Sequence, residues 1–134
     1  MNAVDLMIIL GSLGVMFRAK EVMASIDYFS NMIETGRVII IYKDGDPYAV
    51  MTFSITNDYE PFFKKKTWDY LAHDPSGKII YIEKLVSKGW DRTMRIQFQD
   101  EISEKYPNLE YGVWHRIAQW GDRKVITKRR LTHV

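Results

Sequence analysis

The middle of the chain switches from a strand pattern to a helix pattern within a few residues. Residues 77–86 form a long apolar run, as in a central strand of a sheet. Ser87, Lys88 and Gly89 interrupt this run. Apolar residues then recur at every fourth position, which is typical of the buried face of an α-helix: Trp90, Met94, Phe98 and Ile102. We therefore predict a strand, a short loop and a helix at the centre of the fold.

The segment before this centre predicts two helices and a pair of strands. The helices are expected at 6–17 and 19–35, and the second is expected to end at a left-handed Gly36. Strand-forming runs at 37–42 and 48–55 are separated by a stretch that is dense in turn residues, which predicts an antiparallel hairpin.

Two more strands are expected after the central helix, at 109–115 and 124–131. The resulting order is α-α-β-β-β-α-β-β. It predicts an α+β (α/β) fold in which helices flank a mixed, mostly antiparallel sheet. The step from the central strand through its helix to 109–115 is expected to be parallel and right-handed. The polar segment 57–74 is expected to be a loop that could carry a short helix.

The composition limits the number of domains and the kinds of chemistry. A chain of 134 residues fits one domain, so we predict that residues 1–134 form a single domain. The absence of cysteine excludes disulfides, thiolate zinc sites and cysteine nucleophiles. His73 and His133 have no partner at metal-ligand spacing, so no metal site is expected. The apolar stretch at 6–17 is shorter than the roughly 20 residues of a membrane span and lacks the positive start of a signal peptide. A cytoplasmic location is therefore expected.

The order of elements resembles the acyl-CoA-binding N-acetyltransferase (GNAT) superfamily. The resemblance implies that the loop after the central strand holds the pyrophosphate of acyl-CoA. Backbone N–H groups at the start of the next helix favour an anion at that place. The loop residues so implied are Val86, Ser87, Lys88, Gly89, Arg92 and Thr93. The superfamily has small residues within this loop, whereas this chain has Trp90 and Asp91.

A closer resemblance, over about residues 8–130, is to the toxin-activating lysine acyltransferases. It rests on four short motifs: Leu10-Gly11, Asp44-Gly-Asp-Pro47, the run 77–89, and Arg123-Lys-Val125. Those enzymes transfer a fatty acyl group from acyl carrier protein to lysine side chains of a protoxin. The strand aspartate of that family falls on Glu83 here. The family's N-terminal catalytic histidine has no counterpart, because residues 14–23 contain none.

Acyl transfer to an amine requires a base, a polarised thioester carbonyl and a proton for the departing thiolate. Glu83 lies in an otherwise apolar strand, where burial is expected to raise its pKa and let it act as the base, directly or through water. Alternatively, Glu83 pairs with a lysine. Tyr111 or His115, on the fourth strand, could protonate the leaving sulfur. Alternatively, His115 is a half-buried packing residue.

The leading hypothesis is an acyltransferase that carries an acyl group from acyl-CoA or acyl carrier protein to an amine such as a protein lysine. The donor is a co-substrate, and no bound cofactor is expected. The missing histidine and the bulky Trp90 favour an alternative. In this alternative the chain is an inactive GNAT-like structural or interaction protein, as a homo-oligomer or within a larger assembly such as a phage particle, and its location is then the virion.

Two basic clusters allow a third, weaker hypothesis, nucleic-acid binding. One cluster is Lys64, Lys65 and Lys66, and the other comprises the cations of 123–130. They could receive an acidic carrier protein, the phosphates of CoA or nucleic acid. Alternatively, they are solvated surface and discourage pairing of an edge strand. A net charge of +2 is too small to argue for nucleic acid.

Overall fold

The computed structural model describes residues 1–58, 73–89, 91–117 and 124–130, of which 114–117 and 124–130 are described as backbone. The chain divides into two compact units. The first comprises Met1–Thr52 and Lys84–Arg95, and the second comprises Phe53–Glu83 and Ile96–Val134. The second and third strands each contribute residues to both units.

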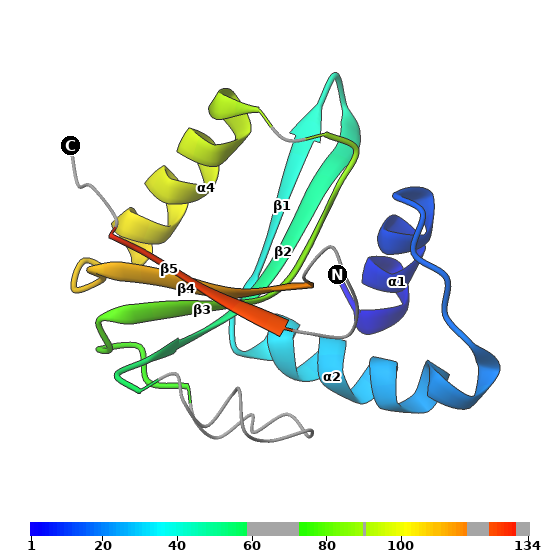
Figure 1. Ribbon diagram of the computed structural model, residues 1–134. Coiled ribbons are helices and arrows are strands. Elements are labelled where there is room, and N and C mark those ends of the chain that lie inside the picture. Colours follow the sequence, from blue (N-terminus) through cyan, green and yellow to red (C-terminus); the bar gives the residue numbers. More distant parts are fainter. Residues whose placement is uncertain (59–72, 90, 118–123, 131–134) are drawn as a thin grey trace. The chain divides into compact units, whose positions relative to one another are not determined.

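The first unit begins with helices and continues into a β-hairpin (Figure 1). Its elements are α1 (Ala3–Ser12), the short 3-10 helix η1 (Ala19–Glu21), α2 (Val22–Glu34), β1 (Val38–Lys43) and the first part of β2 (Asp46–Thr56). β1 and β2 pair antiparallel around a tight turn at Asp44 and Gly45, which confirms the predicted hairpin. Buried apolar side chains come from all four main elements: Leu6, Leu10, Phe29, Met32, Ile41, Val50 and Met51.

The first helix starts and ends earlier than the apolar run at 6–17 predicted. Asn2 and Asp5 form a capping box, in which each side chain accepts a hydrogen bond from the other residue's backbone N–H. The helix therefore begins at Ala3. Gly14 adopts a left-handed conformation with φ of 95°. Its N–H and that of the next residue bond carbonyls of the last helical turn, which ends the helix. Phe17 therefore lies outside α1.

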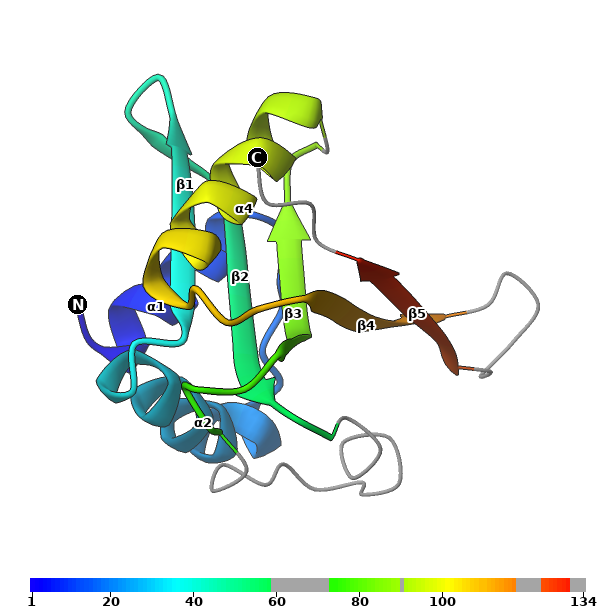
Figure 2. The same ribbon diagram turned by 90° about the vertical axis from the view of Figure 1, so that its left-hand side faces the viewer.

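The second unit contains most of the strand-helix-strand centre. Its elements are the first part of β3 (Ile79–Ser87), most of α4 (Arg92–Lys105), β4 (Tyr111–Ile117) and β5 (Lys124–Arg130). The strands follow the order β1-β2-β3-β4-β5. β3 and β4 run parallel, as predicted (Figure 1), whereas β4 and β5 run antiparallel (Figure 2). The predicted α+β class, element order and mixed sheet are thus confirmed.

The predicted apolar stripe of α4 is buried where the structure describes it. Met94, Phe98 and Ile102 are each at most 6% exposed. Trp90 and the segment 59–72 lie outside the described residues. None of the helices in the described ranges combines the length and the apolar character needed to cross a membrane.

His73 holds the end of β2 in the second unit. Its Nδ1 atom accepts a hydrogen bond from the backbone N–H of Ile55 at 3.0 Å. Its ring also meets the edge of Tyr106, which in turn packs edge-on against Phe53. A buried backbone N–H needs a partner, and here a side chain supplies it. The histidine thus has a packing and hydrogen-bonding role that its spacing in the sequence did not indicate.

Gly77 offers a test of how closely the chain approaches the end of β2. A Cβ atom at Gly77 would lie 2.7 Å from the carbonyl oxygen of Thr56 and 2.8 Å from its carbonyl carbon. Backbone atoms cannot swing aside, so we expect Gly77→Ala to lower the free energy of unfolding by about 1–3 kcal/mol. Gly11→Ala is the matched control. A Cβ there meets nothing within 4 Å, and alanine is favoured over glycine in a helix by roughly 0.5–1 kcal/mol. Urea unfolding would measure both, and equal stability of the two variants would contradict the close approach.

Candidate functional site

Glu83 lies at the point where the parallel pairing of two strands stops. The paired residues run from Ile79 opposite Tyr111 to Ile82 opposite Trp114. Glu83 is the first residue of β3 after this segment, and His115 is the first residue of β4 after it. The Glu83 side chain is half-buried. The structure describes His115 as backbone only, so its predicted role as a proton donor stays a prediction.

The carboxylate of Glu83 is held by a hydroxyl from the neighbouring part of β2. Ser54 Oγ donates a hydrogen bond to Glu83 Oε1 at 2.7 Å, and Ser54 is fully buried. A bond of this length to an ionised acceptor is stronger than one between neutral groups. The sequence also allowed a lysine as the partner of Glu83, and that alternative stays a prediction. Lys84, the next residue of β3, places its Nζ atom over the ring of Tyr28, 5.7 Å from the ring centroid.

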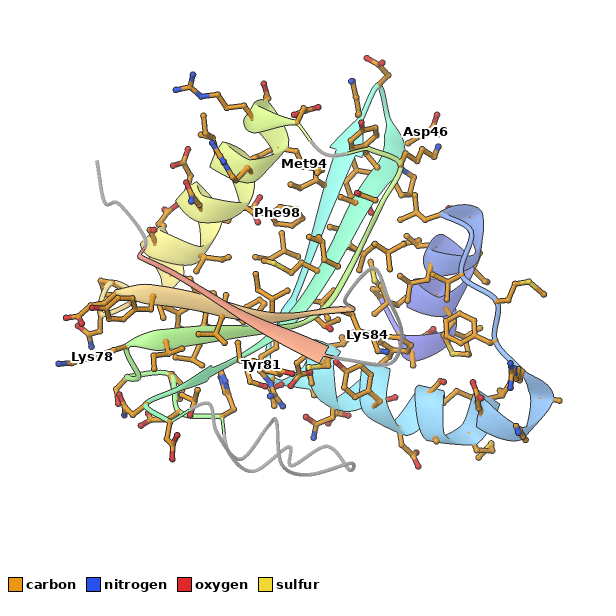
Figure 3. All side chains as sticks on the ribbon, in the orientation of Figure 1. Asp46, Lys78, Tyr81, Lys84, Met94 and Phe98 are labelled. Carbon is orange, nitrogen blue, oxygen red and sulfur yellow. The ribbon has the colours of Figure 1, made fainter. Side chains whose placement is uncertain are left out.

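Tyr81 lies two residues before Glu83, and alternation along a strand puts both on the same face. Tyr81, labelled in Figure 3, is 3% exposed and packs in a cluster with Ile79 and Val113. Burial raises the pKa of Tyr81 to about 12, and the nearby Glu83 carboxylate adds to the rise. The phenol is therefore protonated at neutral pH, next to a carboxylate that accepts hydrogen bonds.

Tyr111, the other predicted proton donor, lies at the opposite end of the paired segment. It is the first residue of β4 and pairs with Ile79, four residues before Glu83. At about 3.3 Å per residue, this offset is about 13 Å along the strand. Tyr111 packs against the cluster around Tyr81. The register therefore does not bring Tyr111 to Glu83.

The predicted pyrophosphate loop, residues 86–93, extends from the last two residues of β3 to the first two residues of α4 and belongs to the first unit. The N–H of Lys88 donates to the carbonyl of Tyr48 at 3.0 Å. A Cβ atom on Gly89 would lie 2.6 Å from the hydroxyl oxygen of the same tyrosine. Val86 and Ser87 are half-buried, whereas Lys88 is exposed. Tyr48 of β2 therefore contacts this loop twice: its carbonyl accepts a backbone hydrogen bond from Lys88, and its hydroxyl lies in the space beside Gly89.

The N-terminus of α4 carries a negative charge that belongs to the chain itself. Asp91 Oδ1 accepts a hydrogen bond from the N–H of Met94 at 2.7 Å, which caps the helix. Arg92 and Thr93 are exposed residues of the first turn. A second anion 4 Å from this carboxylate would be repelled by about 1 kcal/mol in water and about 4 kcal/mol near a protein surface. Asp91 thus stands where the resemblance implied a pyrophosphate.

The described residues include no side chain of the two basic clusters. Residues 64–66 and 123 lie outside the described residues, and the cations of β5 are described as backbone only. In the ranges that the structure covers, no three histidine, aspartate or glutamate side chains gather in a way that could hold a metal ion.

Reasoning from the sequence missed Ser54 and Tyr81. A signal for Ser54 was present, because Thr52, Ser54 and Thr56 alternate along a strand that is otherwise apolar. All three are buried, which places a row of hydroxyls on one face of β2. The hydroxyl of Thr52 is hydrogen-bonded to that of Tyr28 at 2.9 Å. Tyr81 carried no distinguishing signal, since its importance depends on what surrounds it.

Removing the charge of Glu83 should change the titration of Tyr81. We expect Glu83→Gln to bring the pKa of Tyr81 below about 12 but to leave it above 10, because burial is the larger cause of the shift and remains. ¹³C NMR of the tyrosine ring carbons would measure this, with Tyr81→Phe identifying the signal and Glu104→Gln as the control. An unchanged titration would show that Glu83 does not act on Tyr81.

The same shift predicts how stability depends on pH. The unfolded chain loses the Tyr81 proton near pH 10, whereas the folded chain keeps it until about pH 12. Above pH 10 the unfolded state therefore binds fewer protons, and the free energy of unfolding should fall as the pH rises to 12. Tyr81→Phe should lose this part of the pH dependence in urea titrations.

No protein-family model and no curated protein matches the chain. Solved structures do. The chain aligns with the GphF GNAT-like decarboxylase in complex with isobutyryl-CoA at a TM-score of 0.51 and 14% identity, over 72% of this chain and 53% of that one. It aligns with the loading GNATL domain of CurA from Lyngbya majuscula at a TM-score of 0.56 and 10% identity, over 89% of this chain and 63% of that one.

At these identities the likeness concerns the fold. The chain spans between 53% and 63% of the length of the two structures that it resembles. Both are GNAT-like by description, which agrees with the GNAT-like fold that the resemblance implied. The protein therefore has a GNAT-like α+β fold.

Proposed function

We propose that the protein transfers an acyl group from an acyl thioester to an amine, with Glu83 as the base. The observation that carries this proposal is the half-buried Glu83 carboxylate, held by Ser54 where the pairing of β3 with β4 stops. The structural neighbour that was solved with isobutyryl-CoA supports an acyl thioester as the donor. A fold alone does not set chemistry, so the assignment depends on the carboxylate.

The reaction needs one proton acceptor. The acceptor amine is protonated at neutral pH, since a lysine has an ordinary pKa of about 10.4. Glu83 first takes one proton from the ammonium, directly or through water, because only the neutral nitrogen has the lone pair that attacks the thioester carbonyl. The carbon–nitrogen bond then forms and the carbon–sulfur bond breaks. The second proton lost by the nitrogen passes to the departing thiolate, and the proton held by Glu83 is released to solvent. An amide and a free thiol are the products.

The finer parts of the proposal rest on sequence motifs. The short motifs shared with the toxin-activating lysine acyltransferases favour a protein lysine as the acceptor, and acyl-CoA or acyl carrier protein as the donor. The fold comparison supports the GNAT-like fold and does not address this branch. A cytoplasmic location and a single domain over 1–134 belong to the same proposal.

Glu83→Gln tests the base. Glutamine keeps an oxygen that can accept the Ser54 hydrogen bond but cannot take a proton from the amine. We expect kcat to fall by about 10²–10⁴-fold, as is usual when a general base is lost. Glu104→Gln, at an exposed position of α4, changes the net charge equally and should leave kcat unchanged. Release of free thiol from acetyl and long-chain thioesters, with an amine present, would be followed for all three proteins.

Three results would contradict the proposal of an amine acyltransferase with Glu83 as its base. Full activity of Glu83→Gln would remove Glu83 from the mechanism. Release of CO₂ from a carboxylated acyl thioester would favour decarboxylation, as in the GphF neighbour. No binding of any donor, with the protein found as a fixed oligomer or only within a larger particle, would support the inactive assembly protein, and its location would then be the virion.

Ser54→Ala tests whether the serine positions the base. The variant removes a buried hydrogen bond to a charged group, and such bonds contribute about 1.5–3 kcal/mol. We expect kcat to fall by roughly tenfold, which corresponds to about 1.4 kcal/mol, with little change in KM. Ser54→Thr keeps the hydroxyl and should recover part of the loss. An unchanged kcat in Ser54→Ala would contradict a positioning role.

A further inference from the structure

The loop at 86–93 has the composition of an anion clamp, yet atoms of the chain itself occupy part of each of its anion-binding features. A diphosphate is held by backbone N–H groups, by close approach at a residue without a side chain, and by the N-terminus of a helix. Each of these three features is present in the loop or at the start of α4. An atom of this chain occupies part of each feature: the N–H of Lys88, the space beside Gly89, and the N–H of Met94 at the helix N-terminus.

Tyr48 engages the first two features. Its carbonyl oxygen accepts the N–H of Lys88 at 3.0 Å. Its hydroxyl fills the space beside Gly89, since it lies 2.6 Å from where a Cβ atom would stand. The ring also contacts a cation of the hairpin, since Lys43 Nζ lies 5.0 Å from its centroid. The absence of a side chain at Gly89 therefore leaves room for the hydroxyl of Tyr48. This contact accounts for glycine at position 89 without a bound phosphate.

Asp91 engages the third feature. Its carboxylate accepts the N–H of Met94 at 2.7 Å and so provides the negative charge that the helix dipole favours. A phosphate at this place would have to displace the carboxylate or approach it closely. The exposed cations Lys88 and Arg92 are the groups that could oppose this exclusion, so they belong in the test.

We propose that Asp91 and Tyr48 are specificity-determining residues that exclude a nucleoside diphosphate from this loop. The donor would then be recognised by its acyl group and thiol-bearing arm, without a diphosphate clamp at 86–93. This inference rests on the proposed function only in that it takes an acyl thioester as the donor. The exclusion itself concerns only the loop, so it can be tested without turnover.

The binding test uses ADP as a probe of diphosphate recognition on the full chain. The amide signals of Lys88, Gly89, Arg92 and Thr93 would be followed by ¹⁵N NMR. We expect no saturable shift for the wild type. Asp91→Gly frees the Met94 N–H and is well tolerated at a helix cap, so it should bind ADP at least about tenfold more tightly, or 1.4 kcal/mol. Asp91→Asn removes the charge but keeps the cap, and it should gain less.

Saturable binding of ADP to the wild-type loop, with no gain in Asp91→Gly, would overturn the inference. So would loss of that binding in Lys88→Gln or Arg92→Gln, because the loop would then act as a phosphate clamp. A second variant, Tyr48→Phe, removes the hydroxyl beside Gly89 and provides an opening that leaves the helix cap intact. Its gain in ADP binding would be expected to add to that of Asp91→Gly.

The turnover test compares two donors with the same acyl group, acyl-CoA and acyl-pantetheine. We expect the wild type to use them with kcat/KM values within about threefold, and Asp91→Gly to favour acyl-CoA by about tenfold. A strong wild-type preference for acyl-CoA that depends on Lys88 or Arg92 would overturn the inference while the proposed function stands. Turnover of neither thioester would instead remove the proposed function, and the ADP titration would still decide the inference.

Discussion

The requirement that a carboxylate in an apolar strand be hydrogen-bonded shapes the candidate site. Glu83 meets that requirement through Ser54, a fully buried serine that has no contact with water of its own. The bond fixes one carboxylate oxygen and leaves the group half-buried at the end of the parallel pairing. The same negative charge reinforces the protonated state of Tyr81. The Ser54 hydrogen bond thus helps to place the charge of this site, and that charge adds to the effect of burial, which is the larger cause of the raised pKa of Tyr81.

The loop after β3 follows the same physical rule with a different result. Backbone N–H groups and helix termini need partners, and a ligand or the chain itself can supply them. In this protein Tyr48 supplies a partner for the N–H of Lys88, and Asp91 supplies one for the N–H of Met94. A loop that looks suited to a phosphate in sequence can therefore have part of its anion-binding groups occupied by the chain itself. Glycine and cations in a sequence indicate that a loop could bind an anion. The hydrogen bonds that its backbone N–H groups already make show which of these groups are still available for a ligand.

The likeness to GNAT-like structures at 10% and 14% identity shows how little of the sequence the fold needs. The fold depends on the spacing of apolar residues, on turns and on helix ends, and many side chains satisfy these conditions. Chemistry depends on particular side chains at particular places. Glu83, Ser54 and Asp91 are therefore more informative about this protein's activity than its overall resemblance to enzymes of known structure.

The sequence by itself determined the elements and their order, because local periodicity encodes them: the β1–β2 hairpin, the parallel step from β3 to β4 and the buried stripe of α4 were all predicted. It also singled out Glu83, since a charge within an apolar run is visible locally. The early start of α1 was missed, although its capping residues are readable at positions 2 and 5. Only the tertiary structure decided the partners. Ser54 meets Glu83 across 29 residues of sequence, Tyr111 is offset from Glu83 by the strand register, and Tyr48 reaches Gly89 from another strand. Such pairings depend on long-range register, which no local spacing of residues specifies.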